Sequence, residues 1–425
     1  MDKIVTANAE EKSAGKAQKI LRKLAGVSMS IPEIMNLSGM IGRELQEDLR
    51  QQAEAHAQGA LAPQHPELPR LGVVAVDGGR IMTRADAGRG VHDQAWKETK
   101  NACLMTMSSS PSAEDPHPEL PACFADRRSV EELVQAIHSS PAGPRPDGGG
   151  NAEIRGEPAV AAAKPAVSAG KSRDVPADGE VADLPVAQRS KAKRWQPQRM
   201  VRTCLASMVC SDEFGPLVAG EAQRRGFYQA GRRAWLGDGQ AWNWTLHAEY
   251  FPDFVPITDF VHPLGYLYDA ARILSPADPW PAYLRAATAC WQGRVAEVID
   301  ELRRWQAARP AVAGEKLPEE DPRSVLAAVV TYLQNNRKRM DYPRYRREGL
   351  PISTSMIESM IKEMNFRVKG TEKFWNRPEG AESMLQIRAA ALCDDDRLSD
   401  WILNRPGSLF YRRSTSAGPT LATPV

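Results

Sequence analysis

Three acidic residues stand where the fold could bring them to one site. Asp77 directly follows the apolar run "LGVVAV", and Asp238 directly follows "AWLG". An apolar strand that ends in an acid delivers that acid to the rim of a sheet. Glu358 lies early in "STSMIESMIKEMNFRV", where methionines and isoleucines at helical spacing predict one buried face and place Glu358 on the other.

Three carboxylates brought together from distant segments repel one another unless divalent cations hold them. Hard oxygen ligands suit Mg²⁺, and two ions about 4 Å apart can stabilise both the attacking and the leaving oxygen of an in-line phosphoryl displacement. The predicted ligands are Asp77, Asp238 and Glu358, the cofactor is two Mg²⁺ ions with Mn²⁺ as a substitute, and no organic cofactor is expected. The residue types therefore predict phosphodiester cleavage or transfer.

Each acid also has a structural interpretation. Asp77 and Asp238 both precede glycine, and Asp-Gly is a common turn pair, so either acid could simply shape a tight turn. Ser355 and Glu358 fit the capping box S-x-x-E, in which the glutamate bonds back to the start of its own helix. Both interpretations stay open on sequence alone.

The elements that must position these acids are read from hydrophobic period. Residues 10–59 are helical in pattern with breaks at Gly26 and Pro32, which fits either a helical hairpin packed on the next domain or a short helix-turn-helix. The run after residue 71 predicts a strand, a turn at Asp-Gly-Gly and a second strand, and 96–110 predicts a third. Further along, strands at 234–237 and 255–258 alternate with helices at 241–250 and 263–274, which is α/β patterning, and 280–338 is helical throughout.

Composition narrows the class of protein. The 425 residues are 42% hydrophobic and 25% charged, with a formal net charge of +2, which is typical of a globular chain of two or three domains. No apolar run approaches the roughly 20 residues of a membrane helix, and residues 1–22 lack the apolar stretch of a signal peptide, so a cytosolic protein is expected.

The 6 scattered cysteines predict neither structural zinc nor a disulfide framework. Residues 139–190 are rich in Pro, Gly and Ala without aromatics, and this composition predicts a disordered insertion.

Four stretches carry a specific resemblance: "VAVDGGR", "WLGDGQAWNW", "ITDFVH" and "GLPISTSMIESMIKEMNFRVKGTEKFWN", in this order. They resemble the DDE transposases of bacterial insertion sequences, nearest the Kra-type group and related to Mutator-like elements, over roughly residues 69–395. The resemblance implies an RNase H-like catalytic core, a mixed sheet flanked by helices, with Asp77, Asp238 and Glu358 as the catalytic acids. Asp238 and Glu358 are 120 positions apart, which implies an all-helical insertion.

The resemblance also bears on two residues beside the acids. Within "DFVH", Asp259 and His262 match a family signature and would sit at a strand end, with His262 touching the scissile DNA. A histidine at a helix start is otherwise a structural residue just as often. Basic and aromatic residues on both sides of Glu358 are expected to contact DNA phosphates: Arg337, Lys338, Arg339, Arg344, Arg346, Arg347, Lys362, Arg367, Lys369, Lys373 and Trp375.

The resulting prediction is an α/β protein with a short helical N-terminal region. The expected organisation is 1–68 helical, 69–138 first part of the core, 139–190 disordered, 191–274 second part of the core, 275–345 helical insertion, 346–400 C-terminal core helix and basic segment, and 401–425 tail. The expected partners are element terminal repeats and target DNA, bound by a homo-oligomer at the bacterial nucleoid without any membrane. Water would cut the element end and the freed 3′-OH would attack target DNA, with no covalent enzyme intermediate. The alternatives are a nuclease of the same fold without strand transfer and a truncated, inactive DNA-binding remnant.

Overall fold

The computed structural model describes residues 1–64, 68–84, 94–139, 196–309, 317–370 and 375–405. These residues form two compact units: Met1–Pro116, Trp195–Phe260 and Arg339–Val425 make the first, and His117–Arg194 and Val261–Lys338 make the second. Nearly all of the predicted disordered segment, residue 373 and the tail beyond residue 405 lie outside the described residues.

The first unit contains a five-stranded mixed sheet in the order β3-β2-β1-β4-β5. Strand β1 pairs antiparallel with β2, and β2 pairs antiparallel with β3, while β1, β4 and β5 run parallel. The two parallel strands at one edge follow from the helix that connects them, since a parallel neighbour needs a crossover. The strands are β1 (Leu71–Arg84), β2 (Gln94–Ser108), β3 (Gln198–Ser207), β4 (Arg232–Gly237) and β5 (Val255–Thr258).

The turn predicted at Asp77-Gly-Gly is wrong, because β1 is one continuous strand through it. Asp77 pairs with Asn101 of β2, and the pairing runs on to Arg84. A two-residue hairpin turn of the Asn-Gly or Asp-Gly kind needs positive φ, but neither Gly78 nor Gly79 has it. Gly79 instead lets β2 approach closely: a Cβ there would lie 2.6 Å from Thr99 Oγ1. The strand predicted at 96–110 is therefore β2, the second strand of the chain and not the third.

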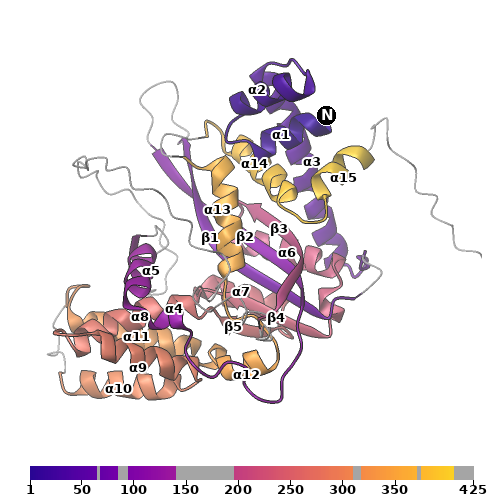
Figure 1. The fold of residues 1–425 in the computed structure, drawn as a ribbon. Helices are drawn as coiled ribbons and strands as arrows, with labels where there is room; N and C mark the ends of the chain where they lie inside the picture. Colours follow the sequence, from indigo (N-terminus) through magenta and orange to yellow (C-terminus); the bar gives the residue numbers. More distant parts are fainter. Residues whose placement is uncertain (65–67, 85–93, 140–195, 310–316, 371–374, 406–425) are drawn as a thin grey trace, which may run out of the picture. The chain divides into compact units, whose positions relative to one another are not determined.

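The two faces of the sheet are covered by different helices. Val74, Val76 and Trp235 belong to a buried core cluster shared with α6 (Ser211–Arg224) and α7 (Ala241–Tyr250). Because side chains alternate along a strand, Asp77 lies on the opposite face from Val74 and Val76. That opposite face carries α13 (Ser355–Val368), which contacts β1 and β2, and α14 (Pro378–Ala391), which contacts β3. Figure 1 shows α13 running across β1 and β2.

The N-terminal helices pack on this unit. The predicted breaks are confirmed: α2 (Ala14–Ala25) ends at Gly26 with φ +64°, and α3 (Ile31–Ala57) starts with Pro32 in its first turn and a Ser30–Glu33 capping box. Helix α1 (Asp2–Glu10) lies within the region 1–68 that the sequence predicts to be helical, although the hydrophobic pattern was followed only from residue 10. Helix α3 contacts α6 and α14, and at its crossing with α14 a Cβ on Gly42 would lie 2.2 Å from the Ser383 carbonyl oxygen. The absence of a side chain at Gly42 therefore permits the close crossing.

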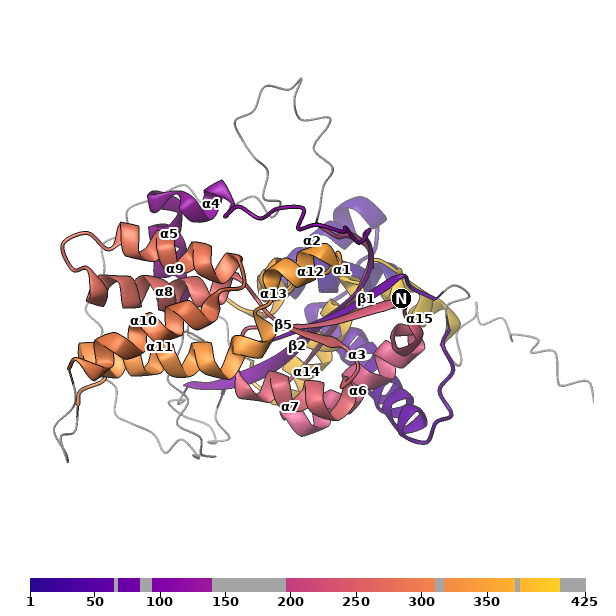
Figure 2. The same ribbon diagram turned by 90° about the horizontal axis from the view of Figure 1, so that it is seen from below.

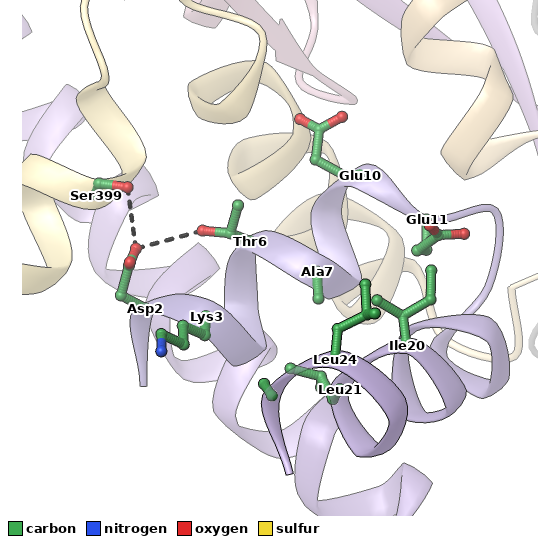
Figure 3. Close-up of a pocket in the computed structure, with 11 residues that line it drawn as sticks. Asp2, Lys3, Thr6, Ala7, Glu10, Glu11, Ile20, Leu21, Leu24 and Ser399 are labelled. Carbon is green, nitrogen blue, oxygen red and sulfur yellow. Dashed lines mark hydrogen bonds between the residues drawn. The ribbon is translucent and has the colours of Figure 1, made fainter. Parts of the chain in front are cut away.

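A groove of about 420 Å³ lies between α1 and α2 (Figure 3). Its apolar wall comes from Ala7, Leu21 and Leu24. At one end Asp2 accepts hydrogen bonds from Ser399 Oγ at 3.0 Å and Thr6 Oγ1 at 3.3 Å. None of the three predicted catalytic acids lines this groove.

The described part of the second unit is entirely helical, and in Figure 1 and Figure 2 its helices α8 to α11 lie side by side. Hydrogen bonds from aromatic side chains connect separate segments of this unit. The Tyr268 hydroxyl donates to Glu131 Oε1 at 3.0 Å, and Trp291 Nε1 donates to the His117 carbonyl oxygen at 2.9 Å. Its helices are α4 (Ala122–Ala125), α5 (Arg127–Ser139), α8 (Val261–Leu274), α9 (Trp280–Trp291), α10 (Val295–Ala307) and α11 (Pro322–Asn336).

The remaining elements are short. The first unit also contains α12 (Tyr342–Arg347), α15 (Arg397–Asn404) and the 3₁₀ helix Phe227–Gln229, and a second 3₁₀ turn spans Arg337–Arg339. The predicted helix at 241–250 and strand at 255–258 are confirmed at those bounds. Among the described residues, no helix is both long enough and apolar enough to cross a bilayer.

Candidate active site

Asp77 lies in the middle of β1, on the sheet face that carries α13. Its pairing partner is Asn101, whose Nδ2 donates to the Asp77 carbonyl oxygen at 3.3 Å. The Asp77 carboxylate accepts the Gly78 backbone N–H at 2.7 Å. Pairing of β1 with β4 ends at Ala75, so Asp77 stands just past the end of the parallel part of the sheet. The predicted strand end at Asp77 is therefore wrong, but Asp77 lies where the pairing of β1 with β4 has stopped.

Asp238 follows β4 directly, as the sequence predicts, and its side chain is only 9% exposed. Its Oδ1 accepts two hydrogen bonds, from the Gln240 backbone N–H at 3.0 Å and from Asn243 Nδ2 at 2.7 Å. Gln240 caps α7 and Asn243 is fully buried in its first turn. Asp238 thus shapes the β4–α7 turn and is at the same time held in one orientation beside β1.

Glu358 lies in the first turn of α13, but the capping box is wrong. The N-cap is Thr354 and Ser355 is the first helical residue, which puts Glu358 one position beyond the residue that a capping box uses. The carboxylate instead accepts the Thr354 hydroxyl, with Thr354 Oγ1 at 3.2 Å from Glu358 Oε1. Glu358 is partly exposed, while Ile357, Met360 and Met364 form the buried side of the helix.

Asp259 is a fourth acid of this region, and it is completely buried. It follows β5, and its backbone N–H donates to the Gly237 carbonyl oxygen at 2.9 Å, which keeps it next to Asp238. Its Oδ1 accepts the Thr354 backbone N–H at 2.8 Å. Thr354 therefore bonds the Asp259 carboxylate through its backbone and the Glu358 carboxylate through its hydroxyl.

One group among the described residues has the spacing of metal ligands. Asp259 and Glu358, together with His262, each offer a ligand atom, and these atoms all lie within 4.8 Å of one another. His262 follows Asp259 by three residues, so the chain itself keeps the two within about 10 Å. Asp77 and Asp238 are not members of that group. Sequence reasoning placed Asp259 near the acids through the "DFVH" match but did not name it as a ligand.

The donor set bears on which metal would fit. Carboxylate oxygens suit Mg²⁺ and Mn²⁺, whereas an imidazole nitrogen is a ligand that transition metals accept more readily than Mg²⁺. Two carboxylates, with the imidazole beside them, fit Mn²⁺ at least as well as Mg²⁺. The Thr354 hydroxyl supplies the kind of outer contact that orients a ligating carboxylate.

Three of the residues predicted to contact DNA, Arg346, Arg367 and Trp375, have buried side chains. Arg346 donates to both Asp115 carboxylate oxygens, at 2.8 and 2.5 Å. Arg367 donates to the Asn8 carbonyl and side-chain oxygens at 2.7 and 3.0 Å, and its burial, with Arg388 nearby, lowers the pKa of Arg367 to about 10. Trp375 Nε1 donates to the Val368 carbonyl oxygen at 2.9 Å. Counting cations by sequence position did not separate these interior side chains from surface ones.

The other predicted contacts are at least partly exposed. Arg344 is exposed but forms an ion pair with Glu348 at 2.7 Å, and the Arg339 guanidinium stacks over Trp244 at 4.2 Å from the ring centroid. Lys373 lies outside the described residues. The exposed or partly exposed cations are Arg337, Lys338, Arg339, Arg344, Arg347, Lys362 and Lys369.

Comparison of the sequence with protein-family models gives no match, and comparison with curated proteins gives none.

Proposed function

We propose that this chain is a metal-dependent DNA phosphoryl transferase of the DDE transposase kind, built on an RNase H-like core. One observation carries the proposal: the three predicted acids come from neighbouring elements of one unit. Asp77 is on β1, Asp238 directly follows the parallel neighbour β4, and Glu358 is on α13, which packs on the Asp77 face of the sheet. The strand order, with an antiparallel β1–β2–β3 meander and parallel β4 and β5, is the one that an RNase H-like core would have.

Thr354 and Asp259 extend this arrangement. Buried Asp259 and partly exposed Glu358 are held together through one threonine, which keeps the two carboxylates in a fixed relation. Like charges at such spacing repel one another, and a bound cation relieves this repulsion. Mg²⁺ or Mn²⁺ held by Glu358 with the neighbouring aspartates would supply charge neutralisation at a scissile phosphate.

The side chains would then act by position. A phosphodiester would lie on the sheet face that carries Glu358 and Asp77. Asn243 fixes the orientation of the Asp238 carboxylate through one hydrogen bond of 2.7 Å. A water would attack the phosphorus atom and lose a proton to solvent, while the 3′-oxygen would leave with the bond electrons and take up a proton. The new 3′-OH would then lose its proton and attack a target phosphate, from which the 3′-oxygen of the target strand would leave with the bond electrons and take up a proton. No enzyme side chain becomes covalently attached in either step.

The test uses the full chain with a plasmid that carries the element's own flanking DNA. Asp77→Asn, Asp238→Asn and Glu358→Gln are each expected to abolish Mg²⁺- or Mn²⁺-dependent cleavage, while melting temperatures stay close to that of the parent chain. Glu379→Gln is a matched control, since Glu379 is an exposed acid in the first turn of α14. Cleavage that survives Glu358→Gln would overturn the proposal.

The same assay separates the two alternatives. Cleavage without joined products would identify a nuclease without strand transfer, and DNA binding without metal-dependent cleavage would identify an inactive remnant. Calorimetric titration of Mn²⁺ adds a readout that does not need activity: Asp259→Asn is expected to weaken metal binding, because it removes a carboxylate charge from the Asp259–Glu358 pair.

A further inference from the structure

One face of α13 leads away from Glu358. Lys362, Phe366 and Lys369 follow Glu358 at four, eight and eleven positions, which places all four on the same side of a helix. Lys362 is exposed and Phe366 is 50% exposed, whereas the other side of the helix, with Ile357 and Met360, is buried. The four side chains therefore form a row along the surface of the first unit.

The positive charge of this row is not cancelled by α13 itself. Glu363, the acid next to Lys362, is held by Arg202 through two hydrogen bonds of 3.2 and 3.1 Å. Within the described part of the chain, neither Lys362 nor Lys369 has an acidic partner within ion-pair distance. Two ammonium groups on one face are therefore available to phosphates.

The row ends at an exposed indole. Trp96 of β2 is 51% exposed, and Lys369 Nζ lies 5.4 Å from its ring centroid. A tryptophan left half in water is uncommon, since burying it would remove a large apolar area from solvent. Trp96 pairs with Met82 in the part of the β1–β2 ribbon that extends beyond β4. Among the described residues, neither β3 nor β4 pairs with this end of the ribbon, where Trp375 forms a single bridge with Thr83 of β1.

We infer that this row, Glu358–Lys362–Phe366–Lys369–Trp96, binds an unpaired DNA strand that leads away from the acidic site. Lys362 and Lys369 contact its phosphates, and a base stacks on Trp96, with Phe366 as a second apolar contact. Positive charge interleaved with aromatic rings is the surface that single strands use, because every base has a face that can stack. The inference rests on the proposed function only for the direction of the strand, from Glu358 outward.

The length of the row sets the length of strand. The distance along α13 from Glu358 to Lys369, the residue that directly follows the helix, is about 16 Å. At about 3.4 Å per stacked nucleotide, the base on Trp96 would be roughly five nucleotides from the scissile phosphate, and fewer in an extended strand.

Binding of a fluorescein-labelled oligo-thymidine 12-mer, measured by anisotropy in EDTA, tests the row without any catalysis. Trp96→Ala is expected to weaken binding about five- to a hundredfold, which is the range for loss of one base stack. Trp96→Phe should restore most of the affinity, because a ring remains. The matched control is Trp305→Ala, because Trp305, on α10 of the second unit, also has a cation against its ring. The Arg309 guanidinium lies 4.2 Å from the Trp305 ring centroid.

A duplex of the same length provides the second arm. Trp96→Ala should change duplex affinity by less than about twofold, because paired bases do not offer their faces. Equal losses for single strand and duplex, or equal losses for Trp96→Ala and Trp305→Ala, would overturn the inference. If the chain binds single strands through Trp96 but never cleaves DNA, the proposed function is refuted and the single-strand site is supported. If cleavage depends on Glu358 but single-strand binding does not change in Trp96→Ala, the proposed function is supported and the single-strand site is refuted.

Discussion

The Thr354 hydroxyl donates to Glu358 Oε1 at 3.2 Å while the Thr354 backbone N–H donates to Asp259 Oδ1 at 2.8 Å. Thr354 is itself only 3% exposed, so no water competes freely for these bonds. Glu358 is thus oriented by a residue of its own helix start, and that same residue fixes a second acid from β5.

Thr354→Val is expected to reduce metal-dependent cleavage by about 10- to 100-fold, the usual cost of losing an outer contact to a ligating carboxylate. The backbone bond to Asp259 survives in this variant, so the loss reports the hydroxyl alone. Thr354→Ser keeps the hydroxyl and should retain most of the rate. Initial cleavage rates at saturating Mn²⁺ give the comparison, and equal rates for Val and Ser would show that the hydroxyl does not matter.

Arg346 and Arg344 are two residues apart and should behave in opposite ways. The Arg346 side chain is fully buried against Asp115, whose side chain is 15% exposed. Arg346→Ala should therefore lower the free energy of unfolding by about 3 kcal/mol, because it leaves a largely buried carboxylate without its partner. Arg344 pairs with Glu348 at the surface, and Arg344→Ala should cost less than about 1 kcal/mol. Urea unfolding followed by circular dichroism measures both, and similar costs would contradict the assignment of Arg346 to the interior.

The salt dependence of DNA binding should depend on Lys362 and Lys369. Replacing both by alanine is expected to flatten the slope of log K against log salt by up to about two units, because each ammonium releases roughly one counterion. The pair Arg127 and Arg128 is a suitable control, since both are exposed but are paired with Glu131 and Glu132. An unchanged slope in the lysine variant would place the phosphates elsewhere.

His247 should make stability depend on pH. Its Nε2 lies 2.8 Å from the Phe254 carbonyl oxygen, and burial, with a smaller contribution from Arg339, lowers the pKa of His247 below its ordinary value of 6.5. The unfolded chain therefore takes up the proton first as pH falls through 6.5, so the folded state loses stability below that value and regains it as pH rises. Melting temperatures between pH 5 and 8 should show this, and His247→Gln should reduce the slope if His247 is the cause.

The local sequence pattern alone was enough to predict several helices and strands. The strand before Asp238, the helix at 241–250 and the strand at 255–258 were predicted at or near their bounds, because period, Gly-Asp-Gly punctuation and Pro positions act within a few residues. The break at Gly26 was readable for the same reason: a left-handed φ there favours glycine.

Other features depended on distant partners. Asp-Gly-Gly at 77–79 has the composition of a turn, but pairing with β2 along the whole strand keeps it extended. Gly79 is accommodated there because Thr99 lies too close for a side chain at that position. The Ser355–Glu358 motif has the spacing of a capping box, but the helix begins one residue earlier, where Thr354 is held by Asp259 from β5.

The sequence by itself determined which residue types stand in order along the chain: acids after apolar strands, an amphipathic helix with one acid on its outer face, and cations around it. Only the tertiary structure decided which of those side chains meet. Arg346 and Arg367 have the same charge as Lys362 and Lys369, but Asp115 and Asn8, more than 200 positions away in each case, draw the two arginines into the interior. Burial is a property of the contacts made between distant segments, and no local pattern of charge records it.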